Sequence, residues 1–428
     1  MIWVCYGVGL LIAIFLFLTA YIRIKMHFWH TQPVFHIYNL KYWLRPPGII
    51  YKEPPPVNKF VNLSNNQLIC INDERSNDIN DERSNDINDE RSNNINDERS
   101  NDINDERSND ISGNSYKPIC QFISDNYVIH ESASYNPTEE DILAYLQCSN
   151  QPGYFNVYKD TKIPFVPEQE MLGVISARLL NVTLNKKKTL HVYYIDNLCV
   201  KPGHRKKGIA PELIQTFHYT ISRANPKVNA YLFKREGQLN AIVPLVCYQT
   251  YAFDMTHYRG ETLLTASMSV IDIGNHNFNL FIAFVKEQMA NFDCVILPDV
   301  SSVLNLIKLG KLKVYGILFQ GELICMYVFR ILKLSYGEKK AVECITILSS
   351  DPKQSDILIA GFNMCWYKIS SAIECSIVLL EETAHSHAVR KALIKDQQVG
   401  YMFKSPTAFF LYNYATYSVP SEKTLLFY

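Results

Sequence analysis

The residues best suited to chemistry lie at positions 201–210, which read KPGHRKKGIA. The run before them, LHVYYIDNLCV, is β-branched and aromatic and predicts a strand. The run after them, PELIQTFHYTISRA, has apolar residues at helical spacing and Pro211 in its first turn, which predicts a helix. Backbone N–H groups at a helix start, with Arg and Lys beside them, form an anion site suited to a pyrophosphate. A basic turn is also common as a solvated surface, so this stretch leaves both interpretations open.

The elements that would position this loop predict a mixed α/β body over residues 116–428. The segment EMLGVISARLLNVTL just before it is expected to form two strands, with a turn near residues 179–181. The following strand then runs into the basic loop, and the loop runs into the helix.

A second candidate is HFWHTQPV, residues 27–34, which follows a long apolar run. Residues 2–22 carry no charge, and about 20 apolar residues are enough to cross a bilayer core. Arg23 and Lys25 come next, so we expect a single-pass membrane protein with its large C-terminal portion in the cytosol. A buried core helix is the alternative. Aromatic residues also gather at membrane interfaces, but such a belt does not require the Thr-Gln-Pro-Val that follows here.

Composition divides the chain further. Lys plus Arg and Asp plus Glu number 42 each, but the acid is concentrated in five copies of an octad, INDERSND, between Ile71 and Asp110, one of which ends in Asn94. One apolar residue per eight cannot bury a core, so we expect a solvated spacer there, extended by the Pro-rich residues 45–60. The 11 Cys are irregularly spaced without a CxxC pair, which indicates neither a disulfide framework nor a zinc site.

Five segments in order resemble glycylpeptide N-myristoyltransferase, a divergent, duplicated member of the GNAT acyltransferases. IDNLCVKPGHRKKGIAPELI is similar to that family's acyl-CoA-binding segment, and HFWHTQPV to its FWxTQPV. The others are DNYVIHESASYNPTEEDILAYL, LGVISARLLNVTL and the closing FFLYNYATYSVPSEKTLLFY. Residues 260–340 align by position alone.

The resemblance implies two tandem GNAT-like lobes of α/β (α+β) class, preceded by a transmembrane helix and a disordered repeat linker. The expected divisions are an anchor at 1–22, an acyl-CoA-contacting segment at 23–44, a linker at 45–115, an acyl-CoA lobe at 116–258 and a peptide-side lobe at 259–428.

The resemblance also implies roles for particular residues. Backbone N–H groups of Asn197 and Leu198 would hold an oxyanion, and the α-carboxylate of Tyr428 would be the base that deprotonates the acceptor amine. Tyr135 matches a peptide-side tyrosine, with a packed core tyrosine as the alternative. The residues expected to contact acyl-CoA are Phe28, Trp29, Thr31, Gln32, Cys199, Val200, Arg205, Lys206, Lys207, Gly208, Ile209 and Ala210.

The chain departs from the family at Asp196–Asn197, where the family has Asn-Phe. Asp196 would act as an extra base, or it would repel the oxyanion. The acidic loop before Tyr135 is also shorter and lacks the family's aromatics, which leaves peptide specificity open.

The chain is expected to be a membrane-anchored N-acyltransferase that moves a fatty acyl group from acyl-CoA to an N-terminal Gly amine. Its expected donor is myristoyl-CoA. Its partners would be acyl-CoA, N-terminal Gly peptides or proteins and a membrane contacted through residues 2–22, with no metal and no nucleic acid. Two alternatives stay open. One is an acyl-CoA- or peptide-binding pseudoenzyme, and the other a structural membrane protein, such as a virion component.

Overall fold

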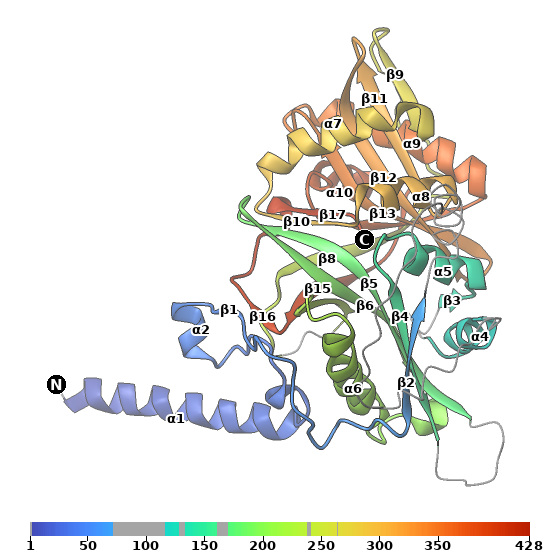
Figure 1. Cartoon of the computed structure of the whole chain (residues 1–428). Helices are drawn as coiled ribbons and strands as arrows, with labels where there is room; N and C mark the ends of the chain where they lie inside the picture. The colour runs from blue at the N-terminus through green and yellow to red at the C-terminus, as the bar shows by residue number, and fades with distance from the viewer. Residues whose placement is uncertain (1, 72–115, 128–132, 161–169, 238–240, 263) are drawn as a thin grey trace, which may run out of the picture.

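The computed structural model describes residues 2–71, 116–127, 133–160, 170–237, 241–262 and 264–428. A single large sheet runs through the body, with helices on its faces (Figure 1). Its main path, β17-β10-β5-β6-β7-β15-β8-β14-β13-β12-β11-β9, crosses both halves of the chain. The mixed α/β prediction is therefore confirmed.

The same order of elements occurs once in each half. In the first half, β4 (Gly153–Lys159), β5 (Met171–Leu184) and β6 (Lys188–Val200) are antiparallel neighbours, and α6 (Ile209–Ala224) crosses to β7 (Ala230–Glu236), parallel to β6. The second half repeats this with β11 (Leu312–Phe319), β12 (Glu322–Tyr336), β13 (Lys339–Ser349), α9 (Ser355–Ile373) and β14 (Ile377–Glu381).

The two halves exchange strands, so residue 258 is not a spatial boundary. Strands β8 (Val246–Asp254) and β15 (Gly400–Tyr412) lie between β7 and β14, and join the halves. At the other edge, β10 (Cys294–Leu297) and β17 (Thr424–Leu426) extend the sheet beyond β5. Further elements are α2 (Leu40–Leu44), β9 (Met268–Ile273), α4 (Lys117–Asn126), β3 (Ala133–Tyr135), α5 (Glu139–Gln147), α7 (Phe278–Gln288), α8 (Val300–Lys308) and α10 (His387–Lys395).

Helix α6 forms because its apolar residues recur every four positions. Ile209, Leu213, Phe217 and Ile221 are all buried in one core cluster against β5, β6 and β7. Each such side chain contributes roughly 1.5–3 kcal/mol when fully buried. The packing fixes the start of α6 relative to β6.

The predicted turn at residues 179–181 is wrong, because β5 is one continuous strand to Leu184. Residues 179–181 contain no glycine or proline. The chain instead turns at Asn185 and Lys186, which both adopt positive φ angles of 50° and 60°, a region that Asn tolerates better than most residues.

The expected disordered linker does not begin at residue 45. Residues Gly48–Ile49 form β1, which pairs with β16 (Tyr414–Ala415), and residues Asn66–Ile71 form β2, which pairs with β4. Ile71, the first residue of the octads, is buried at 1% exposure. The other repeat residues lie outside the described residues.

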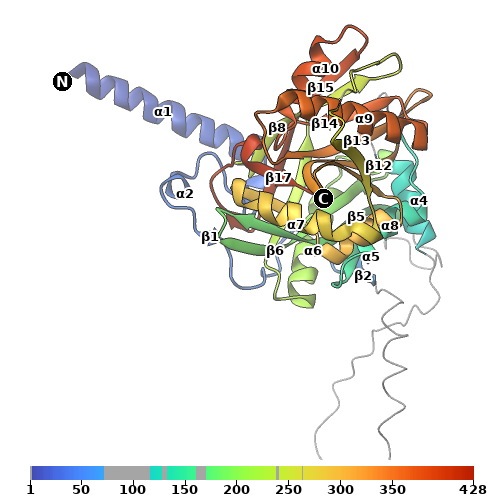
Figure 2. The same ribbon diagram turned by 90° about the horizontal axis from the view of Figure 1, so that it is seen from above.

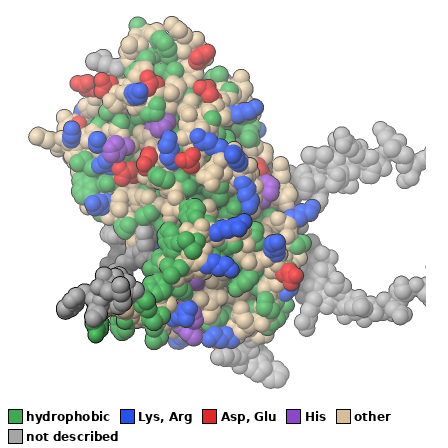
Figure 3. Space-filling model, turned by 90° about the vertical axis from the view of Figure 1, so that its left-hand side faces the viewer, with side chains coloured by type: hydrophobic (Ala, Val, Ile, Leu, Met, Phe, Trp, Pro, Cys, Tyr) green, Lys and Arg blue, Asp and Glu red, His purple; other side chains and the backbone are tan. Residues whose placement is uncertain are grey.

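The N-terminal helix α1 (Ile2–Lys25) projects from the body in two perpendicular views (Figures 1 and 2). Tyr6, Leu10, Phe17 and Ile24 along it are exposed. Seen from that side, hydrophobic side chains gather near a band of Lys and Arg (Figure 3). No helix within the described part of the chain has the length and apolar character needed to cross a membrane, so the predicted spanning helix is not supported.

Candidate active site

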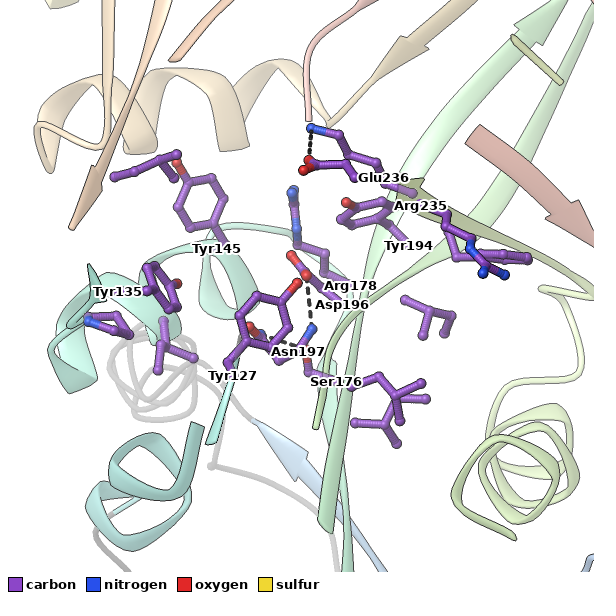
Figure 4. A pocket seen from close by; sticks show the side chains of 18 of the residues that line it. Tyr127, Tyr135, Tyr145, Ser176, Arg178, Tyr194, Asp196, Asn197, Arg235 and Glu236 are labelled. Carbon is purple, nitrogen blue, oxygen red and sulfur yellow. Dashed lines mark hydrogen bonds and ion pairs between the residues drawn. The ribbon is translucent and has the colours of Figure 1, made fainter. Parts of the chain in front are cut away.

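A cavity of about 550 Å³ lies where β5, β6 and β7 meet β12 and α5 (Figure 4). This volume is within the usual range for small-molecule sites. Among the sequence-predicted site residues, it is lined by Trp29, Tyr135, Asp196, Asn197 and Leu198.

Strand β6 breaks where the oxyanion donors were expected. The pairing of β5 with β6 shifts between Val174↔Cys199 and Ser176↔Asp196, so Asn197 and Leu198 form a β-bulge opposite one residue. Asn197 has a left-handed φ of 52°. Pairing between β6 and β7 ends at Ile195, so the bulge has no partner strand on that side.

The donors at the bulge are not equally available. The backbone N–H of Asn197 donates to Oδ1 of Asp196 at 2.8 Å, and the Asn197 side chain donates to Oγ of Ser176 at 2.9 Å (Figure 4). Leu198 is 36% exposed. The carboxylate of Asp196 therefore occupies one of the two expected oxyanion donors.

The basic loop follows β6 directly. Cys199 and Val200 are buried at the strand end, and burial raises the pKa of the Cys199 thiol to about 12. Arg205 is tied down because its guanidinium donates to the carbonyls of Val200 and Asn126, both at 3.0 Å. Lys206 and Lys207 are exposed.

Gly208 turns the loop into α6 with a φ of +90°, which glycine adopts without the steric cost that a side chain would bring. Ile209 is buried, and Ala210 packs at the edge of the same core cluster. The start of α6 thus lies next to the exposed cations Lys206 and Lys207, a combination suited to an anion.

The HFWHTQPV segment docks on its own body. The indole of Trp29 stacks on Phe233 of β7 with ring centroids 5.6 Å apart, and Phe28 packs edge-on against Phe60. The Thr31 hydroxyl donates to the Phe28 carbonyl, which fixes this turn. Gln32 is buried, and its Oε1 accepts from the Tyr412 hydroxyl at 2.7 Å. Of these four residues, Trp29 lines the cavity. The contacts of Phe28, Thr31 and Gln32 fix the conformation and position of the segment.

Tyr135 reaches the cavity from β3, which pairs with β12. Its ring lies 5.7 Å from that of Tyr127. Burial and the charge of Asp196 raise the pKa of Tyr135, so its phenol stays protonated at neutral pH.

A buried ionic cluster forms the wall between the two halves. Nζ of Lys234 on β7 lies 2.6 Å from Glu381 on β14 and 3.2 Å from Glu343 on β13, and Arg330 pairs with Glu343 at 2.5 Å. Burial and the charge of Glu343 raise the pKa of Glu381 to about 7. Burial also raises the pKa of Glu343, but the charges of Arg330 and Lys234 outweigh that effect and lower the pKa to about 2.

Tyr428 belongs to this cluster, and is not among the residues that line the cavity. Its hydroxyl donates to Glu381 at 2.5 Å and accepts from Lys234 at 2.6 Å, while its ring packs on Phe409. The phenol thus lies one side chain behind the cavity wall. The role predicted for its α-carboxylate stays a prediction.

Sequence reasoning missed several lining residues, above all Arg178, Tyr145 and Tyr194, as well as Lys234, Glu343 and Arg330. Arg178 could have been found, since it is a lone charge inside the apolar run GVISARLL, and charged residues are rarely buried without a reason. The others lie on elements that the sequence did not connect with the site.

The comparisons with known proteins agree with the fold. Residues 119–230 match the family model for the acetyltransferase (GNAT) family. The fold resembles that of N-myristoyltransferase. Three structures of the Saccharomyces cerevisiae enzyme with bound myristoyl-CoA, one of them also with inhibitors, match with TM-scores of 0.60, 0.62 and 0.63. Identity is 13% in each, over 92% of this chain and 94%, 90% and 91% of theirs. A comparison with curated proteins found no significant match.

Proposed function

We propose that this protein is an acyl-CoA-dependent N-acyltransferase that moves a fatty acyl group to the amine of an N-terminal Gly, with myristoyl-CoA as the donor. One observation carries the proposal. The bulge at Asn197–Leu198 opens into the cavity on one side and leads, within about a dozen residues, to the exposed basic loop before α6 on the other. A thioester whose CoA phosphates bind at α6 would therefore have its carbonyl at the bulge.

The donor side would use Lys206, Lys207 and the N–H groups at the start of α6 to hold the CoA pyrophosphate. Trp29 closes the apolar side of the cavity and would contact the acyl-CoA. The bound myristoyl-CoA named for the yeast structures supports a long acyl chain as the first donor to test.

The reaction itself needs no oxidant or reductant. The amine nitrogen attacks the thioester carbon, a C–N bond forms, and the carbonyl oxygen becomes an oxyanion that the Leu198 N–H would stabilise. The C–S bond then breaks, and CoA leaves as its thiol. The proton lost by the ammonium goes to a base, for which Asp196 in the cavity wall and the α-carboxylate of Tyr428 are the candidates.

The test uses the full chain. Myristoyl-CoA is titrated by calorimetry, a Gly-initiated peptide is added, and acyl-peptide is measured by mass spectrometry. Binding followed by acyl-peptide is the expected result. Absence of myristoyl-CoA binding would overturn the proposal.

A second candidate, binding without transfer, has one specific observation in its favour. The Asp196 carboxylate holds the Asn197 N–H, which an oxyanion would otherwise use. The variant Asp196→Asn separates the two functions. If it raises turnover, Asp196 suppresses catalysis in the natural chain; if it lowers turnover while binding persists, Asp196 is the working base.

A further inference from the structure

Arg178 of β5 is a buried cation for which the described residues supply no polar partner. It is 4% exposed, and its guanidinium makes no hydrogen bond and no ion pair with any described residue. It lies between two rings, 5.0 Å from the centroid of Tyr145 and 5.1 Å from that of Tyr194. A guanidinium carries five N–H donors and stays charged in proteins, and burying such a charge unpaired is costly. The site therefore fits an anion.

The side chain of Arg178 points into the cavity and not into the core (Figure 4). The guanidinium carbon lies over the rings of Tyr145 and Tyr194, and its N–H donors remain available for a ligand. The other deeply placed cations of this wall are already neutralised, since Lys234 pairs with Glu343 and Glu381, and Arg330 pairs with Glu343.

An opposite charge lies beside it on the next strand. Asp196 is paired with Ser176, and Arg178 is two residues further along β5, on the same face. Two residues of strand span about 6.4–6.8 Å. The two groups attract each other electrostatically but form no ion pair, so the cavity offers a separate carboxylate and guanidinium.

The distribution of charge matches an acceptor that is itself a zwitterion. The CoA phosphates would bind at the cationic start of α6, and a fatty acyl chain carries no charge that could pair with Arg178. An ammonium at Asp196 would lie next to the bulge, where the thioester carbonyl is expected. An anionic group a few bonds away from that amine would then reach Arg178.

We propose that the acceptor carries a carboxylate near its reacting amine, and that Arg178 binds this carboxylate while Asp196 binds the ammonium. The carboxylate would be supplied by a free amino acid or by an acidic residue at the start of a peptide. This inference rests on the proposed N-acyltransferase function, because it names the acceptor class of the same site.

The experiment compares acceptors that differ in one charge. Gly-Glu-initiated and Gly-Gln-initiated peptides of otherwise equal sequence, together with free glycine and free glutamate, are offered with myristoyl-CoA, and kcat/KM is measured for each. A preference of about tenfold or more for Glu over Gln, which equals about 1.4 kcal/mol, supports the peptide source. Faster acylation of the free amino acids supports the other source.

Variants locate the preference. Arg178→Gln should reduce the Glu:Gln ratio to about one, and Arg178→Lys should restore part of it. Arg223→Gln, which removes an exposed guanidinium on α6, should keep the ratio unchanged. Equal rates for the Glu and Gln peptides in the wild type, with the free amino acids acylated no faster than either peptide, would overturn this inference and leave the proposed function intact.

A titration without acyl-CoA keeps the two proposals distinguishable. Calorimetry of the Gly-Glu peptide against wild type and Arg178→Gln should show weaker binding to the variant, whether or not any transfer occurs. Equal affinity of the two proteins would overturn the anion site by itself.

Discussion

Strands β6 and β13 hold equivalent places in the two halves, and both are broken at the point where a crossover helix follows. The break in β6, at Asn197–Leu198, opens into the cavity. The break in β13, at Ile345, is fully buried. Beside it the C-terminal strand closes the gap, because the Thr346 hydroxyl donates to the Leu426 carbonyl and Phe427 and Tyr428 are buried there.

The loops before the two crossover helices, α6 and α9, also differ in charge. The loop before α6 carries Arg205, Lys206 and Lys207 and a glycine in the left-handed region. The loop before α9 carries Asp351, whose carboxylate accepts from the Lys353 N–H and the Gln354 side chain. In the first half, the break in β6 is open and the loop before α6 is cationic. In the second half, the break in β13 is buried and the loop before α9 carries the carboxylate of Asp351. The comparison supports the proposal that the reaction uses the first copy, with the second copy as structural support.

The largest effect is expected at the open break. Leu198→Pro removes one backbone N–H, and loss of one oxyanion donor typically lowers kcat by about 10²–10³-fold. Leu198→Ala keeps the N–H and should retain most of the turnover. Single-turnover assays, with circular dichroism as a check on folding, would measure both, and equal activity of the two variants would place the oxyanion elsewhere.

The ionic cluster between the copies predicts a pH dependence of stability. The pKa of Glu381 is raised from 4.5 to about 7 by burial and by Glu343, so between these values the folded protein binds more protons than the unfolded one. The free energy of unfolding should therefore fall as pH rises through this window, by at most about 3 kcal/mol.

Glu381→Gln should remove this fall. The measurement is chemical denaturation at pH 5 and pH 7.5, with the exposed Glu374→Gln as control. A Glu381→Gln profile parallel to the wild type would show that Glu381 does not titrate in this range.

A smaller effect is expected from the two loops. Lys206→Glu combined with Lys207→Glu should weaken myristoyl-CoA binding by about tenfold or more, equal to about 1.4 kcal/mol, with the difference shrinking at high salt. Lys353→Glu, at the start of α9, should leave the affinity unchanged. Calorimetry at two salt concentrations decides, and similar losses in both variants would mean that the α6 loop has no special role.

The smallest effect concerns backbone conformation. Gly208→Ala places a side chain at a φ of +90°, which should lower the free energy of unfolding by about 1 kcal/mol. Gln354, the residue before α9, has an ordinary φ of −81°. Gln354→Ala should therefore change the free energy of unfolding by only a few tenths of the Gly208→Ala effect. Denaturant titrations would compare them, and a stable Gly208→Ala would argue against strain at the helix start.

The sequence allowed the first copy to be predicted because its signals are local. The strand, the basic loop and the helix of residues 190–224 each carry their own pattern, and a role for the backbone of Asn197 and Leu198 was expected from resemblance. The cavity wall was not foreseen, since Lys234, Glu343 and Glu381 come from three separate strands that meet through long-range pairing. The linker was misread from residue 45 because β2 consists of ordinary polar and apolar residues that gain order by pairing with β4.

The exchange of strands between the halves also has a consequence for how the chain folds during synthesis. β7 acquires its second neighbour, β15, and β10 acquires β17, from residues beyond position 399. The sheet therefore stays incomplete while the chain leaves the ribosome, and the free edges of β7 and β10 remain unpaired until the last segments arrive. Such edges favour association between chains, and long-range pairing of this kind is slow. Truncation before β15 should thus yield an aggregating product and not an independent half.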